Sequence, residues 1–401
     1  MSTALGTWSH AAPQLTLSDV LVARGHKVAF ATYGMTLDAW LKNYPQVTPV
    51  NMGASPMLSK ETMEMTIHMT NAEQHVDMMD MLRFSYSVLA DCFKDNFLFY
   101  RKHFTENPAQ PLPPNYYLIG PQIPPRYPPL SDDLRAFLDA RPRTVYVGFG
   151  TMAIVSQQRL STMLQALLVA HRDGLLDGVV WGLMLTAQMD GAKLRSVTVD
   201  GVTHSIDDMR SGKHPVIRLM DHAPQRAVLT HPSTKLFISH CGISSIYETI
   251  DAGVPVLGVP VAGDQENNAR RITELNAGRW IQKLEVNEDT LASAFAELLS
   301  PESETLQEIR GNMSSLQRMI HIAHRDRARG ADLIELAAVP GAVKFHQSAD
   351  WRMPWWKAQN YDLYAFVLVF LGGLVYTLVA GTRYAIPLLR AAANQRKEKQ
   401  A

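Results

Sequence analysis

Short apolar runs alternate with stretches of helical composition through the second half of this chain. The runs are TVYVGFG (144–150), VVWGLML (179–185), PVIRLMD (215–221), KLFISH (235–240) and VPVLGVP (254–260). Apolar runs of this length between helices predict the strands of a parallel sheet that helices cover on both faces. We therefore expect an α/β fold, in which ligands bind beyond the carboxyl ends of the strands.

The segment ISHCGISSIYE (238–248) gathers polar groups where one predicted strand ends and a helix begins. Backbone N–H groups at a helix N-terminus, together with two serine hydroxyls and the imidazole of His240, would bind a phosphate. Glu248, one turn into the helix, is placed to accept hydrogen bonds from sugar hydroxyls. On these residues alone, capping of the helix by Ser244 or Ser245 is an equally good interpretation.

The longer segment HAPQRAVLTHPSTKLFISHCGISSIYETIDAGVPVLGVPVAGDQENNAR (222–270) closely resembles the donor-binding signature of the UDP-glycosyltransferases. The resemblance covers most of the chain. It implies a GT-B fold, with two Rossmann-like domains facing a cleft, and inverting transfer without a metal. A UDP-sugar would be a co-substrate and no cofactor is expected. The chain has no D-x-D motif, which fits a metal-free reaction.

The resemblance also implies roles for individual residues. In the family, the residue matching Gln225 lies beside the uracil, and the residue matching Glu248 holds the ribose hydroxyls. The matches to the phosphate contacts are Thr151, His240, Ser244 and Ser245, and the matches to the sugar contacts are Asp264 and Gln265. Gly242 would let the backbone approach the ligand closely. His222 stands where the family usually has a tryptophan that stacks on uracil, and imidazole offers less stacking area.

Histidine is the natural general base for this chemistry, because its ordinary pKa of about 6.5 suits proton transfer at neutral pH. The segment SHAAPQLTLSDVLVARGHKVAF (9–30) resembles the family's N-terminal motif, in which a histidine before the first helix faces the cleft. His10 matches that histidine. No residue matches the aspartate that orients it in the family. Asp91 and Asp95 are interpreted as residues on a helix surface.

The N-terminal part, residues 1–118, is predicted to be an incomplete Rossmann-like domain on the acceptor side. Residues 12–24 have helical spacing, Gly25 suits a helix C-terminus and HKVAFAT (26–32) is typical of a strand. The methionine-rich residues 60–100 are predicted to be helical, either as ordinary core or as the lining of an acceptor pocket. Because an incomplete sheet leaves an edge and apolar faces uncovered, we expect possible self-association.

The remaining domain boundaries follow from composition. A Pro-rich run, PLPPNYYLIGPQIPPRYPPL (111–130), can form neither a helix nor a central strand, so 119–143 is predicted to be a linker. The donor-binding Rossmann-like domain is expected at 144–340. A juxtamembrane segment (341–361), a transmembrane helix (362–382) and a basic tail (383–401) would follow.

The expected membrane segment runs from Leu363 to Gly381 without a charge and is long enough to span about 30 Å of hydrocarbon. A buried core helix is the alternative. Aromatic residues precede the span, at Trp351, Trp355, Trp356 and Tyr361, and basic residues follow it, so the tail would be cytoplasmic. The N-terminus resembles no signal peptide. KEKQA at the C-terminus resembles a dilysine retrieval signal, which favours the endoplasmic reticulum.

Charge and cysteine content exclude other classes. The 38 basic and 38 acidic residues cancel, so no nucleic-acid partner is expected. Cys92 and Cys241 form no C-x-x-C pair, so no structural zinc is expected.

The sequence predicts an enzyme that transfers a hexose from a UDP-sugar to a hydroxyl of a small lipophilic acceptor. The alternative is a truncated, non-catalytic membrane protein that binds the UDP-sugar.

Overall fold

The computed structural model describes residues 2–3, 8–32, 40–53, 119–151, 153–184, 186, 193–261, 263–325, 328–342, 349 and 353–398. The Met-rich stretch 60–100, with Asp91, Asp95 and Cys92, lies outside these residues, as do Trp351 and Lys399. The chain divides into two compact units. The first comprises Met1–Gln110 with Leu118–Glu335, and the second comprises Pro111–Tyr117 with Leu336–Ala401.

A parallel six-stranded sheet forms the centre of the first unit, in the order β11-β10-β9-β4-β5-β8. Its strands are β4 (Thr144–Gly148), β5 (Gly178–Gly182), β8 (Ile217–Met220), β9 (Thr234–Ser239), β10 (Val256–Gly258) and β11 (Gly278–Trp280). The five strands that the apolar runs predicted are confirmed, with shorter bounds. β11 was not predicted, because GRW is short and contains a charge.

Both faces of this sheet are buried. Val145 and Val147 of β4 pack into the larger hydrophobic core, which contains residues of α6 (Gln157–Arg172), α9 (Ile243–Ala252), α10 (Gln265–Glu274), α11 (Glu288–Leu299) and α12 (Glu304–His324). Tyr146, between these two valines, packs into a second core with α5 (Asp132–Asp139) and α8 (Gln225–Leu229). Because side chains alternate along a strand, successive residues face different layers of helices.

The N-terminal part contains a second parallel sheet in the order β1-β2-β3. Its strands are β1 (Ser2–Thr3), β2 (Ala29–Thr32) and β3 (Thr48–Asn51), and helix α1 (Trp8–Ala23) connects the first two. The expected helix and strand are confirmed. Gly25 has φ +91°, the left-handed conformation that a glycine after a helix adopts.

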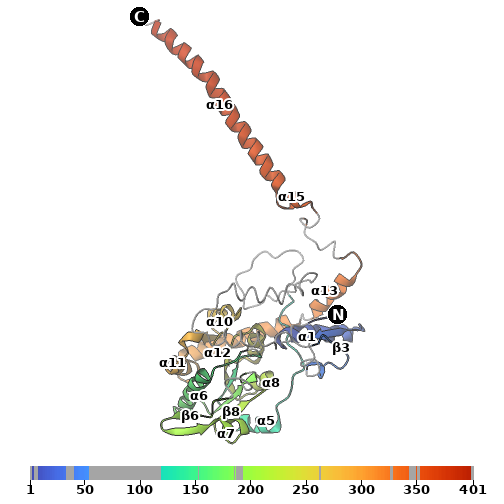
Figure 1. Cartoon of the computed structure of the whole chain (residues 1–401), viewed down its shortest axis with the longest axis vertical. Coiled ribbons are helices and arrows are strands. Elements are labelled where there is room, and N and C mark those ends of the chain that lie inside the picture. The colour runs from blue at the N-terminus through green and yellow to red at the C-terminus, as the bar shows by residue number, and fades with distance from the viewer. Residues whose placement is uncertain are drawn as a thin grey trace. The chain divides into compact units, whose positions relative to one another are not determined.

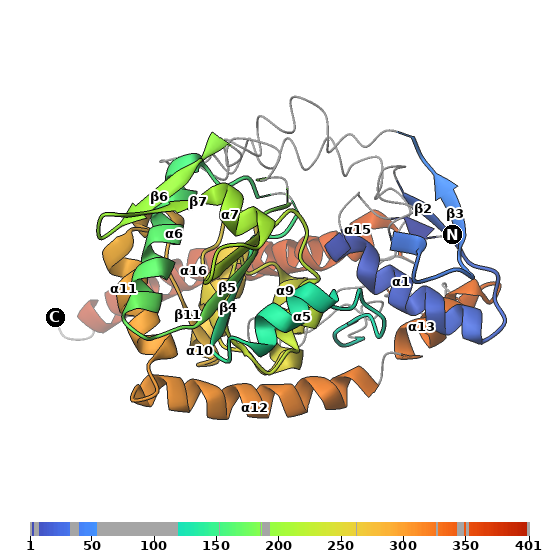
Figure 2. The same ribbon diagram turned by 90° about the horizontal axis from the view of Figure 1, so that it is seen from below.

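Helix α13 (Ala328–Ala338) begins after the last helix of the large sheet and contacts α1. Arg24 donates hydrogen bonds to Asp332 at 2.7 Å and to Glu335 at 2.6 Å. Figure 2 shows this part of α13, in orange, beside α1, in blue. The C-terminal end of the first unit is therefore attached to its N-terminal sheet.

Two features of the first unit differ from the composition-based expectations. Residues 119–130 form neither helix nor strand, as the prolines predict, but α5 lies within the range expected to be a linker, capped by Ser131. An antiparallel hairpin, β6 (Ser196–Val199) and β7 (Val202–Ser205), precedes the short helix α7 (Ile206–Ser211). A 3₁₀ turn, η4, spans Lys283–Glu285.

The second unit contains α15 (Trp355–Ala358) and the long helix α16 (Tyr361–Glu398), drawn in red in Figure 1. Tyr361–Asn394 is long and apolar enough to cross a membrane. Its 18-residue apolar window has a mean hydropathy of 2.3, and none of that window is buried. The structure therefore does not show α16 as a buried core helix. The helix continues beyond the expected end at residue 382, because the following residues are mostly good helix formers.

Candidate functional site

The candidate site lies where β4 and β9 end side by side, with Gly148 paired to Ser239. The next residues are Phe149, Gly150 and Thr151 on one strand and His240, Cys241 and Gly242 on the other. The carboxyl ends of parallel strands lie at one edge of a sheet, so these turns come together. The turns that carry Thr151 and His240, which both match phosphate contacts of the family, therefore lie side by side.

The imidazole of His240 is packed between two glycines. A Cβ atom added to Gly150 would lie 2.7 Å from Nε2 of His240, and one added to Gly242 would lie 2.5 Å from the same atom. Gly150 also has φ +71°, which other residues rarely adopt. Gly242 was expected to admit a ligand to the backbone, and the structure shows that it also makes room for His240.

Burial lowers the pKa of His240 to about 4. Its Nδ1 is buried and makes no hydrogen bond of ordinary geometry with the described residues. The ring is therefore neutral at pH 7, so it can offer a hydrogen bond to a diphosphate but no positive charge.

Helix α9 begins at Ile243, and its N-cap residue is Gly242, which makes no side-chain capping bond. Ser244 and Ser245 lie in the first turn, inside the helix, so the interpretation of either as the N-cap is wrong. Cys241, with φ +63°, turns the chain from the strand into the helix, and its N–H donates to Ser239 Oγ at 3.1 Å. The first-turn N–H groups consequently lie at the edge of the sheet where an anion would bind.

Gln225 joins the two residues that the resemblance placed at the phosphate and the ribose. Its Nε2 donates to Ser245 Oγ at 3.0 Å and to Glu248 Oε2 at 2.7 Å. Burial raises the pKa of the Glu248 carboxyl, and the hydrogen bond from Gln225 opposes that rise. The hydroxyl of Tyr146, a contact that was not predicted, lies 3.5 Å from Gln225 Oε1.

Asn268 connects the turn after β9 to Asp264. This buried amide donates to the Cys241 carbonyl at 3.0 Å and to Asp264 Oδ2 at 2.9 Å. Gln265 Oε1 accepts a hydrogen bond from the Val261 N–H at 2.9 Å. Asn268 was not predicted to belong to the site, although its place one helical turn after Asp264 was a usable signal.

The other predicted site residues lie on different elements. Thr151 follows Gly150 directly, and the exposed His222 lies just beyond β8. His10 was expected to precede the first helix, but it lies inside α1, in the first turn, because that helix begins at Trp8. The part of the chain that the structure describes contains no group of three or more His, Cys, Asp or Glu residues that could hold a metal ion.

Comparisons with known proteins agree with this geometry. The family model for UDP-glucoronosyl and UDP-glucosyl transferase matches residues 54–388. UDP-glycosyltransferase stmC of Aspergillus ustus is 28% identical over 82% of this chain and 69% of its own length. UDP-glycosyltransferase 1 of Phaeomoniella chlamydospora is 29% identical over 73% of this chain and 58% of its own length.

Solved structures show the same architecture. A UDP-glucosyltransferase from Polygonum tinctorium, capable of glucosylating indoxyl, superposes with a TM-score of 0.56 at 18% identity, covering 83% of this chain and 98% of its own. The fold is that of a GT-B glycosyltransferase. The chain belongs to the family of UDP-glucuronosyl and UDP-glucosyl transferases. It spans between 44% and 69% of the length of four fungal relatives.

Proposed function

We propose that this protein transfers a hexosyl group from a UDP-sugar to a hydroxyl of a small lipophilic acceptor, with inversion. The observation that carries the donor assignment is the hydrogen-bonded group of Gln225, Ser245 and Glu248 beside His240. These side chains supply an amide, a hydroxyl and a carboxylate next to a helix N-terminus. That set is suited to a uracil, a diphosphate and a ribose diol.

In the proposed reaction, the acceptor oxygen attacks C1 of the sugar from the face opposite the UDP. The bond from C1 to the β-phosphate oxygen breaks, its electron pair leaves with UDP, and the acceptor proton passes to a base. His10 is the proposed base, on its match to the family motif. The N-terminus of α9 and the neutral His240 would stabilise the charge that grows on the diphosphate.

For the other binding residues we propose the roles implied by the resemblance. Thr151 and Ser244 would bind phosphate, Asp264 and Gln265 would bind the sugar hydroxyls, and His222 would stack on the uracil. Gln265 Oε1 accepts a hydrogen bond from the Val261 N–H, which holds this side chain at the start of α10. We propose no metal requirement.

We propose that α16 anchors the protein in the endoplasmic-reticulum membrane with its C-terminal tail in the cytoplasm. The apolar helix Tyr361–Asn394 and the basic residues after it support this placement.

A second candidate function is UDP-sugar binding without catalysis. It is favoured by the position of His10, which lies inside the first turn of α1 and not before that helix, as the family motif implies. The site of donor binding would be the same in both proposals. Only the acceptor side and the base would differ.

Purified full-length protein distinguishes the two candidates. UDP binding is measured by calorimetry, and UDP release is measured from UDP-glucose and UDP-glucuronate with a pool of phenol and sterol acceptors. Acceptor-dependent release that His10→Ala abolishes, and that the control His26→Ala retains, supports the transferase. UDP binding without release supports the non-catalytic protein, and absence of UDP binding refutes both.

A further inference from the structure

Arg226 follows Gln225 in α8 and forms an ion pair with the helix that carries the other donor-site residues. Its Nη2 lies 2.8 Å from Oδ2 of Asp251, near the end of α9. The two side chains are only 16% and 15% exposed. A largely buried pair of this kind resists both water and salt, so its geometry is more persistent than that of a surface pair.

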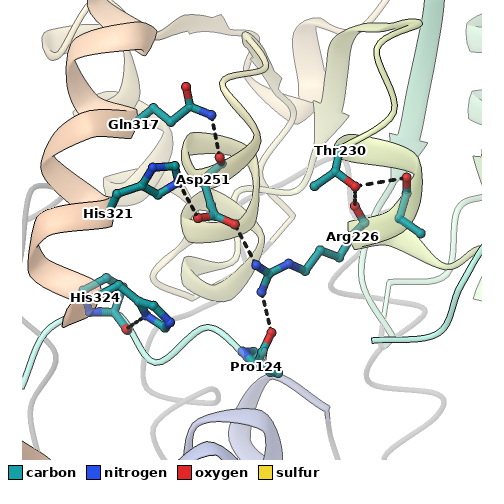
Figure 3. A network of polar contacts seen from close by, with 9 residues as sticks. Pro124, Arg226, Thr230, Asp251, Gln317, His321 and His324 are labelled. Atoms are coloured by element: carbon teal, nitrogen blue, oxygen red, sulfur yellow. Dashed lines mark hydrogen bonds and ion pairs between the residues drawn. The ribbon is translucent and has the colours of Figure 1, made fainter. Parts of the chain in front are cut away.

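Further contacts fix both members of the pair, as Figure 3 shows. Arg226 Nη1 donates to the Pro124 carbonyl at 2.6 Å. On the other side, His321 Nε2 lies 3.0 Å from Asp251 Oδ1, and Gln317 Nε2 donates to the Asp251 carbonyl at 2.7 Å. The guanidinium therefore joins α8, α9 and the segment before α5, while α12 holds its carboxylate partner.

On α9, the ion pair lies one helical turn from the Gln225–Glu248 hydrogen bond, because Glu248 and Asp251 are three residues apart and share a helix surface. On α8, Gln225 and Arg226 are adjacent, so the short backbone between them connects the two contacts. Any change in how α8 packs on α9 at Arg226 must also change the 2.7 Å contact of Gln225 with Glu248.

We propose that Arg226 is a positioning residue for donor binding, which keeps Glu248 ionised and aligned with Gln225 to receive the ribose hydroxyls. The inference rests on the proposed function of this site. Without the guanidinium, the carboxylates of Glu248 and Asp251 would face each other across one helical turn in a buried environment. One of them would then take up a proton, since like charges in a low-dielectric site disfavour double ionisation.

The groups that act on Glu248 come from each element around it. Arg226 on α8 lowers the pKa of Glu248, whereas Asp251 on α9 raises it, and burial is the largest cause of its raised value. Tyr146 on β4 has a raised pKa, chiefly because it is buried and in part because of the charge of Glu248. His321 on α12 contacts Asp251, with 3.0 Å between Nε2 and Oδ1. The series below is therefore also run in a His321→Gln background.

The test measures binding of UDP and of 2′-deoxy-UDP to the full-length protein over a series of pH values from mildly acid to mildly alkaline. A weakening of UDP binding at acid pH would report protonation of Glu248. We expect Arg226→Gln to move that weakening to higher pH by about one unit, which is about a fivefold loss of UDP affinity at the old midpoint. The loss should be small for 2′-deoxy-UDP, which lacks one of the ribose hydroxyls.

Asp251→Asn removes the carboxylate that raises the pKa of Glu248 and keeps the shape of the side chain. We expect it to move the acid weakening in the opposite direction, to lower pH. Arg218→Gln is the matched control, because Arg218 is also 16% exposed and also pairs with an aspartate, Asp133, away from the donor residues. It should keep the wild-type pH profile.

Opposite shifts in the two variants support the inference, because a merely structural role would weaken binding without moving the profile. Equal weakening at every pH in both variants, for UDP and its deoxy analogue alike, overturns it. If Arg226→Gln does not fold, an unchanged profile in Asp251→Asn alone overturns it. If the wild-type protein binds no UDP, the proposed function fails and this inference fails with it. The two failures are thus distinguishable.

Discussion

Gln225 and Glu248 are joined by a 2.7 Å hydrogen bond that connects α8 to α9 across the carboxyl end of the sheet. Because Gln225 also donates to Ser245, its amide nitrogen has both of its hydrogens engaged. These contacts within the protein preorganise the pair, because they orient the Glu248 carboxylate. Preorganisation of this kind increases affinity by reducing the ordering that binding requires.

Gln225→Ala should weaken UDP binding by about 10- to 100-fold, because a hydrogen bond to a buried charged group contributes about 1.5–3 kcal/mol. Calorimetric titration of the folded variant measures this loss. Gln165→Ala, a change to a glutamine on the exposed side of α6 that contacts the Thr198 carbonyl, is the control and should bind UDP normally. Undiminished affinity in Gln225→Ala would contradict the assigned role.

How far the sequence predicts this site depends on how many positions along the chain separate the residues that interact. The strand ends and the first turn of α9 are local features, so the His240–Glu248 cluster could be placed from the chain alone. The capping alternative could not be resolved locally, since it depended on where α9 begins. The links through Asn268 and Arg226 join residues that are 27 and 25 positions apart, and no local pattern specifies them.

Two elements, β11 and the β6–β7 hairpin, were not predicted from the sequence, and the physical reasons differ. β11 is an edge strand of three residues, GRW, whose pairing with β10 defines it more than its own composition does. The β6–β7 hairpin did carry a local signal. Asp200 and Gly201 both have positive φ, at 50° and 78°, and an Asp-Gly pair between β-branched residues is a strong indicator of a tight hairpin turn.

Gly150→Ala should reduce stability more than alanine does at other glycines with a left-handed backbone conformation. Gly174, with φ +74° and nothing within 4 Å of an added Cβ, is a matched control for the backbone penalty of about 1 kcal/mol. At Gly150 the added methyl also meets His240 Nε2 at 2.7 Å, which must displace the imidazole. We expect Gly150→Ala to lose UDP affinity as well as stability, and Gly174→Ala to lose stability alone. Equal UDP affinity in both variants would refute the packing argument.

Two buried histidines should contribute stability that increases with pH between about pH 4 and pH 6.5. His240 and His214 both have pKa values lowered to about 4, each chiefly by burial, from an ordinary 6.5. Between these values the two imidazoles bind more protons in the unfolded chain than in the folded chain, so their contribution to the free energy of unfolding increases with pH and is complete above 6.5. Each group can contribute about 3 kcal/mol.

Chemical denaturation at a series of pH values tests this dependence. His240→Gln should flatten the increase by roughly half, because His214 still contributes. If His240→Gln keeps the full slope, His240 is not held neutral by the fold.

Attachment of the protein to membranes should depend on insertion of the apolar part of α16. Leu374→Arg places a charge near the middle of the candidate span Tyr361–Asn394, where insertion costs about 2.5–3.5 kcal/mol per arginine. Ala392→Arg, near the polar end, is the control. We expect alkaline extraction to release the Leu374→Arg protein from membranes and to leave the control in the pellet. Retention of both proteins to the same degree would argue that this helix does not set membrane attachment.

Two helical glycines should respond to alanine with opposite sign. Gly311 in α12 has nothing within 4 Å of an added Cβ, so Gly311→Ala should stabilise the protein by about 0.5–1 kcal/mol through helix propensity. Gly330 in α13 contacts α1, and an added Cβ would lie 2.6 Å from Cδ2 of Leu17 and 3.2 Å from Cδ1 of Ile119. Overpacking there should cost about 1–3 kcal/mol, which exceeds the gain in propensity.

The difference tests whether α13 holds the N-terminal sheet in place, because propensity alone predicts the same stabilising change at both glycines. Thermal and urea unfolding of the two variants give the sign directly. Leu17→Ala should rescue Gly330→Ala by removing the side chain that the new methyl meets, and a double-mutant cycle would measure that coupling. Stabilisation by Gly330→Ala, or a coupling of zero with Leu17→Ala, would show that the α1–α13 contact is looser than the structure describes.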